Sequence, residues 1–115
     1  MTDIWSYSSK DWTSDKDLVG YDVEATDGSI GKIDESTAEA GRQQVVVDTG
    51  FWIFGKKRLI PAGAIKQINH SDEKVLVGLT KEQIKQAPDF DETRRDEEDF
   101  RTTHERYYDP YRTRV

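Results

Sequence analysis

The sequence predicts an all-β protein: a small, partly open β-barrel with one short helix after the last strand and charged, flexible termini. Two observations carry this prediction. Across residues 17–91, short apolar and β-branched runs alternate with turns rich in glycine and aspartate, which is typical of antiparallel sheets and small barrels. The flanking residues 1–16 and 92–115 show no sustained strand period.

The first expected hairpin lies within residues 18–34. Tyr21, Val23 and Ala25 alternate with polar residues, which is the period of a half-buried strand. An Asp-Gly pair follows them, and Asp-Gly between apolar runs is a strong hairpin signal. In the return strand, Gly31 indicates a bend or a close approach of another backbone.

The middle of the chain predicts a central strand over residues 43–48 and then a second hairpin. This hairpin has an aromatic arm at residues 51–54 and a tip at residues 55–58. Its other arm ends at Pro61, which cannot donate to a sheet ladder, so we expect a strand end or a sheet edge there.

The last hairpin joins residues 65–68 to residues 74–79 through a polar turn. Thr80 and Gln83 then have the spacing of a capping box, in which each side chain satisfies a free backbone donor of the other residue. Pro88 ends the helix after about two turns.

The two termini are expected to lie outside the domain. Residues 1–16 are interpreted as a flexible segment, with docking of Trp5 and Trp12 as the alternative. Residues 92–115 form a charged tail that is either disordered or an exposed helix, with Phe100 as its main apolar contact.

Composition limits the function. The 115 residues contain no cysteine, carry a net charge of −6, and are 34% hydrophobic and 35% charged. The acidic balance argues against a generic nucleic-acid binder. The absence of a spanning apolar run and of a signal pattern favours a cytoplasmic protein without membrane insertion.

Few residues have the pattern of a reactive site. His70 and His104 lack a second ligand at zinc spacing, and neither lies near a nucleophile in the sequence, so both are interpreted as solvated. The acidic run at residues 96–99 lacks the spacing of a calcium loop. We therefore predict no catalytic residue, no metal, no cofactor and no enzymatic activity.

The candidate interaction surface is the second hairpin, where aromatic residues adjoin three consecutive cations. Adjacent strand residues face opposite sides, so part of the aromatic arm must point away from its own core. A homodimer that covers this arm is expected. The residues are Phe51, Trp52, Phe54, Lys56, Lys57 and Arg58.

Three strings of this chain resemble the PRC-barrel family, named after the cytoplasmic barrel of the photosynthetic reaction-centre H subunit. They are DGSIGK at residues 27–32, GKKRLIPA at residues 55–62 and TKEQIKQAP at residues 80–88. The resemblance covers residues 17–91 and implies a small, partly open barrel that serves as an adaptor, without catalytic residues.

A non-enzymatic protein-interaction module is therefore the expected function. The resemblance also implies two alternatives: an RNA- or ribosome-associated factor, and a regulator of electron or proton transfer in a membrane complex, like the H subunit. The first alternative would use Lys56, Lys57 and Arg58, and its binding would weaken with salt.

Overall fold

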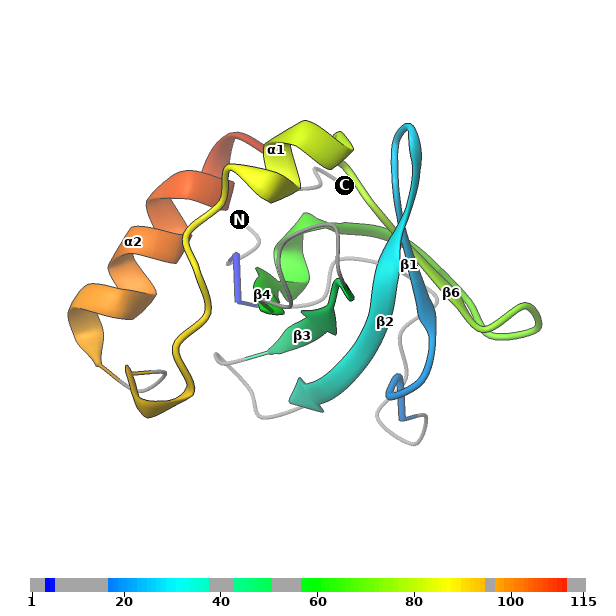
Figure 1. Ribbon diagram of the computed structural model, residues 1–115, viewed down its shortest axis with the longest axis horizontal. Helices are drawn as coiled ribbons and strands as arrows, with labels where there is room; N and C mark the ends of the chain where they lie inside the picture. Colours follow the sequence, from blue (N-terminus) through cyan, green and yellow to red (C-terminus); the bar gives the residue numbers. More distant parts are fainter. Residues whose placement is uncertain (1–3, 6–16, 38–42, 51–56, 95–96, 112–115) are drawn as a thin grey trace.

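The computed structural model describes residues 4–5, 17–37, 43–50, 57–94 and 97–111. These residues form a six-stranded sheet and two α-helices (Figure 1). The strands are β1 (Asp22–Ala25), β2 (Gly28–Thr37), β3 (Gln44–Asp48), β4 (Lys57–Pro61), β5 (Ile65–Asn69) and β6 (Lys74–Val77). The helices are α1 (Lys81–Lys85) and α2 (Glu98–Tyr108), with short 3₁₀ turns η1 (Ala62–Ala64), η2 (Glu92–Arg94) and η3 (Asp109–Tyr111).

The strand order is β4-β3-β2-β1-β6-β5, and every neighbouring pair is antiparallel except β1 and β6. The predominance of β-structure is thus confirmed. The sheet is not closed, because β4 and β5 stand at its two ends. Pro61 is the last residue of β4, so it lies at both a strand end and a sheet edge, as its missing N–H requires.

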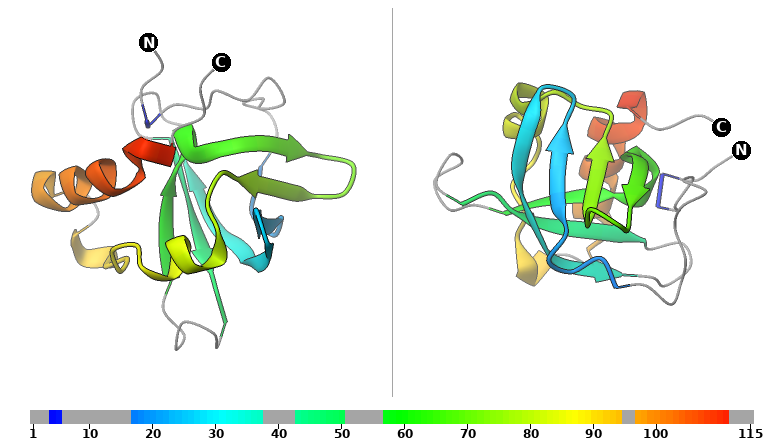
Figure 2. Two further views of the ribbon diagram at one scale, coloured as in Figure 1. Left: turned by 90° about the horizontal axis from the view of Figure 1, so that it is seen from above. Right: turned by 90° about the vertical axis from the view of Figure 1, so that its right-hand side faces the viewer.

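Strand β2 joins the two halves of the sheet. It pairs with β1 through its first residues and with β3 through its later ones, and the register shifts once along each pairing. Such bulges bend a strand and increase its twist. Figure 2 shows the result: β1, β2 and β6 run side by side, and β3 and β4 cross them steeply.

Gly31 lies in the bent part of β2, where the backbone of β3 passes very close to it. Its φ is 151°, and a Cβ placed there would lie 2.0 Å from the carbonyl oxygen of Asp48 in β3. Only glycine permits so close an approach of two backbones. The close approach that the sequence predicts at Gly31 is confirmed.

Helix α1 begins as the capping box predicts. Thr80 Oγ1 accepts from the backbone N–H of Gln83 at 3.2 Å, and Gln83 Oε1 accepts from the backbone N–H of Thr80 at 2.8 Å. The helix ends at Lys85, ahead of Pro88. Its one buried residue, Ile84, packs into the hydrophobic core.

Residues from both termini contribute to this core. Ile4 and Trp5 are 2% and 4% exposed, and Phe100 and Tyr108 of α2 are 6% and 0% exposed. The expectation of flexible termini is therefore wrong for these residues, and the two alternatives hold instead: Trp5 is docked, and the carboxy-terminal segment contains a helix. Large aromatic side chains bury a large apolar area once the sheet offers a surface to pack against.

Ile4 and Trp5 are also bound through their backbones. The carbonyl of Ile4 accepts from the N–H of Gly63 in η1 at 2.7 Å, and the carbonyl of Trp5 accepts from the N–H of Gln43 at 2.9 Å. The guanidinium of Arg101 in α2 lies 4.4 Å from the centroid of a Trp5 ring. This dipeptide therefore connects the sheet, the turn after β4 and helix α2.

Candidate functional site

The residues of the predicted interaction surface divide into two groups. Phe51, Trp52, Phe54 and Lys56 lie outside the described residues. Lys57 and Arg58 belong to β4, where they pair with Asp48 and Val47 of β3. The predicted hairpin tip at residues 55–58 is therefore wrong in its second half, because two of its cations are strand residues.

Lys57 is half-exposed and forms an ion pair. Its Nζ lies 2.5 Å from Oδ2 of Asp34 in β2. The hydrogen bond to Asp34 raises the pKa of Lys57, and the nearby charges of Asp48 and Glu35 act in the same direction. One of the three cations that the sequence offers to a ligand here is thus already balanced by an acid of the sheet.

Arg58 is buried, with 3% of its surface exposed. Its Nε donates to the carbonyl of Ile84 at 3.1 Å, and Nη2 donates to that of Lys85 at 2.9 Å. Nη1 lies 2.7 Å from Oδ1 of Asp89. Arg58 thus closes the carboxyl end of α1, where the last carbonyls lack partners in a following helical turn and a cation is favoured. It is a structural residue and not part of an exposed cation patch.

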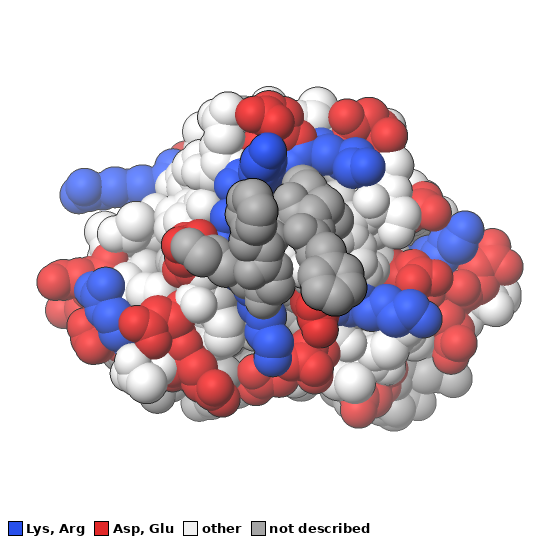
Figure 3. Space-filling model, viewed as in Figure 1, with Lys and Arg blue, Asp and Glu red and all other residues white. Residues whose placement is uncertain are grey.

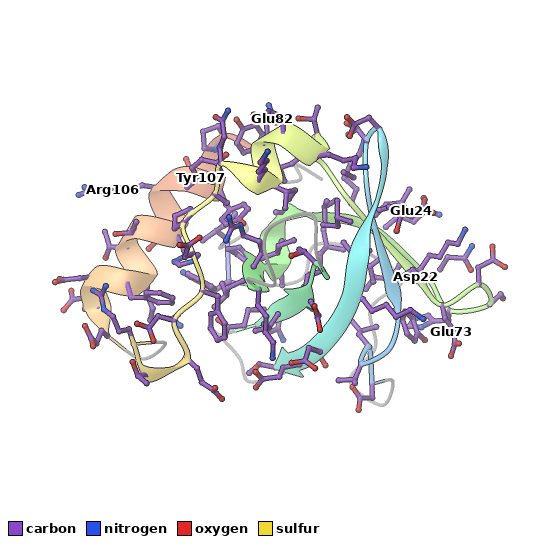
Figure 4. The ribbon with its side chains drawn as sticks, in the orientation of Figure 1. Asp22, Glu24, Glu73, Glu82, Arg106 and Tyr107 are labelled. Carbon is purple, nitrogen blue, oxygen red and sulfur yellow. The ribbon has the colours of Figure 1, made fainter. Side chains whose placement is uncertain are left out.

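Elsewhere on the described surface the charges are mixed. Figure 3 shows acidic and basic side chains interspersed on the face seen in Figure 1. On the β1 side, Lys32 lies 3.9 Å from Asp22, and Lys74 lies 3.3 Å from Glu24. Asp22 and Glu24 project near the turn that holds Glu73 (Figure 4). Because lysines face two of these acids, the group does not form a strongly acidic patch.

A more distinctive group of side chains lies on the inner face of α2. Phe100, His104 and Tyr108 are buried there at four-residue spacing. The Phe100 and His104 ring centroids are 4.4 Å apart, and the His104 and Tyr108 rings stack at 6.4 Å. The prediction that His104 is solvated is wrong, because its side chain is fully buried in this stack.

The hydrogen bonding of His104 defines its tautomer. Nδ1 lies 2.9 Å from the carbonyl oxygen of Phe100. A carbonyl only accepts, so Nδ1 carries the proton and Nε2 has a free lone pair. Nε2 is buried and has no hydrogen-bond partner among the described residues. Burial lowers the pKa of His104, and the charge of Arg58 lowers it further, so the imidazole is neutral.

His104 lines a cleft between α2 and residues 88–94, the segment that follows α1. The cavity volume is about 320 Å³. The residues around it are Pro88, Asp89, Asp91, Arg94, Phe100, Thr103 and His104. A concave site with several polar groups and a titratable residue of altered pKa is the usual form of a small-molecule site. We refer to it as the α2 cleft.

Hydrogen bonds connect both walls of this cleft to neighbouring elements. On one side, Asp89 is tied to Arg58, and the N–H of Phe90 donates to the carbonyl of Lys57 at 3.4 Å. On the other side, the hydroxyl of Tyr107 donates to the carbonyl of Gln83 and joins α2 to α1. Figure 4 shows Tyr107 turned toward α1 and Arg106 turned away from it. The cleft walls are thus anchored to β4 and α1.

Sequence reasoning missed the α2 cleft, although one signal pointed to it. Phe100, His104 and Tyr108 recur every four residues, and this spacing places side chains on one face of a helix. The dense charge between them made the whole segment resemble a solvated tail.

Comparison with known proteins assigns no family. No protein-family model matches the chain, and no curated protein is similar to it at a significant level. In the described part of the chain, no three histidine or acidic residues group as metal ligands. None of the described helices has the length and apolar character needed to cross a membrane.

Proposed function

We propose that this chain is a non-enzymatic adaptor of PRC-barrel type, acting in the cytoplasm as a partly open barrel that binds another protein and itself. The mostly β fold supports the proposal. So does the placement of the three PRC-like strings, at the β1–β2 turn, in β4 and at α1. The three strings thus lie in the sheet, in the end strand β4 and in the helix α1 that packs against the core.

The proposed contact surface is the connection between β3 and β4. Asp48 pairs with Lys57, so the chain reverses between these two residues. Phe51, Trp52 and Phe54 lie in that connection by sequence. Among the described residues, Val19 is the one large apolar side chain that is exposed, at 48%. No other large apolar side chain of the described residues is exposed to this degree, so the apolar contact of an adaptor is sought in this connection.

Light scattering of the full chain tests the proposal. At high micromolar concentration we expect a dimer, and we expect Trp52→Lys or Phe54→Lys to give a folded monomer. Val19→Lys is the matched control, because it adds the same charge at an exposed apolar position elsewhere. A wild-type chain that stays monomeric, or three variants that dimerise equally, would contradict the proposed self-association.

The RNA-associated alternative has less support. Of its three cations, Arg58 is buried and Lys57 is paired with Asp34. A measurement of RNA binding at increasing salt distinguishes it from the adaptor, since phosphate contacts weaken steeply with salt. The role of a regulator in a membrane complex remains an alternative that the family resemblance alone supports.

A further inference from the structure

Helix α2 is attached to the sheet through its side chains. It packs against β4, and Phe100, His104 and Tyr108 are buried on its inner face. In the part of the chain that the structure describes, no backbone hydrogen bond joins α2 to a strand. The helix can therefore leave the sheet without breaking a strand pairing.

Two polar atoms on the inner face of α2 lose water when the helix docks. Among the described residues, Nε2 of His104 and the hydroxyl of Tyr108 are buried without a hydrogen bond to protein. A buried polar group without a partner destabilises the state that buries it. The docking of α2 thus depends on the apolar contacts of its aromatic rings, and these two atoms oppose it.

The docked position of His104 disfavours a second proton on the ring. Nδ1 already donates to the carbonyl of Phe100 at 2.9 Å, so an added proton binds to Nε2. That atom would then be a buried N–H donor without an acceptor among the described residues. Once α2 has left the sheet, water accepts from the same N–H group.

The charges around His104 act in the same direction. Burial lowers the pKa of His104 most, and the positive charge of the buried Arg58 lowers it further. The nearby carboxylates are engaged, since Asp89 binds Arg58 and Asp91 accepts from Thr93. The charged or titratable groups around the ring are Arg58 of β4, Tyr108 of α2, and Asp89, Asp91 and Arg94 of the segment after α1.

We propose that α2 is an acid-released cover: protonation of His104 undocks the helix from β4 while the six-stranded sheet stays folded. Below about pH 6.5 the undocked helix binds a proton that the docked helix does not bind, so each pH unit raises the undocked fraction by up to about tenfold. Above that pH the ring is neutral in both states and α2 stays docked. Free carboxylates titrate lower, near about pH 4, so the window between about pH 6.5 and about pH 5 belongs to histidine.

Undocking exposes apolar surface that is buried at neutral pH. Phe100 and Tyr108 belong to the same core cluster as Ile60 of β4 and Ile84 of α1. Release of α2 makes part of this surface accessible, so its exposure depends on pH. This device does not depend on the proposed adaptor function.

Amide hydrogen exchange of the full chain, followed by NMR between about pH 7.5 and about pH 5 and corrected for the intrinsic effect of pH, tests the proposal. We expect the amides of α2 to be less protected than those of the central strands β2 and β3 at every pH, because α2 opens without the sheet. Below about pH 6.5 the protection of α2 should fall by up to about tenfold per pH unit.

Variants separate the titration of His104 from the packing of the helix. His104→Phe keeps an aromatic ring in the stack and should remove the pH dependence of α2 protection. Tyr108→Phe is the matched control on the same face, because it removes the other unpaired polar atom and no group that titrates in this range. It should raise α2 protection by the same factor at every pH. His70→Gln alters the histidine bonded to Tyr21 and should change neither quantity.

Two results would overturn the proposal. One is equal protection of α2, β2 and β3 at every pH, which would mean that the helix opens only when the whole chain unfolds. The other is the same pH dependence of α2 protection in His104→Phe as in the wild type. If His104→Phe does not fold, the wild-type ring decides: a His104 ring that titrates near about pH 6.5 while α2 stays protected refutes the proposal. A ring that stays neutral to lower pH while α2 protection falls supports it.

Discussion

Gly31 is a single residue on which the bend of strand β2 depends. Two properties of this position exclude a side chain: its positive φ of 151° and the carbonyl of Asp48, 2.0 Å from where a Cβ would lie. Gly20 separates the two effects, since it has a φ of 91° but no heavy atom within 4 Å of its Cβ position.

We therefore expect Gly31→Ala to lower the free energy of unfolding by more than about 2 kcal/mol, through strain and steric conflict together. Gly20→Ala should cost about 1 kcal/mol, through strain alone. Chemical denaturation of both variants gives the comparison. Equal losses would show that the β2 and β3 backbones do not approach as closely as described.

His104 predicts how stability depends on pH. Its folded pKa is lowered, so between that value and the unfolded pKa of about 6.5 the unfolded chain binds more protons. The contribution of this residue to stability is complete above the unfolded pKa and is lost as pH falls toward the folded pKa. The charged or titratable groups around it are Arg58, Tyr108 and the cleft residues Asp89, Asp91 and Arg94.

We expect the free energy of unfolding to fall by at most about 1.4 kcal/mol per pH unit below about pH 6.5 from this residue. His104→Phe should flatten that slope. The control is His70→Gln, which alters the other histidine, whose Nδ1 is hydrogen-bonded to the hydroxyl of Tyr21 at 2.9 Å. If both variants keep the wild-type slope, then carboxylates cause the acid sensitivity.

At the scale of the element, α1 is a helix of five residues that depends on its ends. A helix this short is not stable in isolation. Its stability must therefore come from its cap and from its packing against the core. The capping box closes its start, and Arg58 closes its other end.

Thr80→Ala should cost about 1 kcal/mol of unfolding free energy, because Gln83 loses the acceptor for its backbone N–H. Thr80→Ser keeps the hydroxyl and should restore most of the loss. Denaturation midpoints of the two variants measure the difference. An unchanged midpoint for Thr80→Ala would indicate that water replaces the cap without cost.

At the scale of the whole molecule, the contact between the Ile4-Trp5 dipeptide and η1 can be tested by mutation. A Cβ on Gly63 would lie 2.7 Å from the carbonyl oxygen of Ile4 and 2.8 Å from its Cα. Gly63→Ala should therefore destabilise the full chain because the first residues can no longer dock.

The prediction is a double-mutant cycle. Removal of residues 1–5 should cost about 3–5 kcal/mol, because Ile4 and Trp5 leave the core. In that shortened chain Gly63→Ala should cost little more, so the two effects are not additive. Additive losses in thermal or chemical denaturation would place the dipeptide elsewhere than against η1.

Most of the local structure could be predicted from the sequence. The Asp-Gly hairpin, the interior position of β3, the place of Pro61 and the capping box at Thr80 follow from turn chemistry and from side-chain period. These are interactions between near neighbours, so a short stretch of sequence contains all the groups that decide them.

Which polar and aromatic residues are buried depends on contacts between distant parts of the chain. Arg58 looked like a surface cation, and becomes buried because the carboxyl end of α1 arrives over β4. His104 and Tyr108 looked like parts of a solvated tail, and Trp5 like part of a loose terminus. Each of these side chains is buried against residues far away in the sequence. The hydrophobic effect that brings such residues together is non-directional, so a short stretch of sequence does not show which partners will meet.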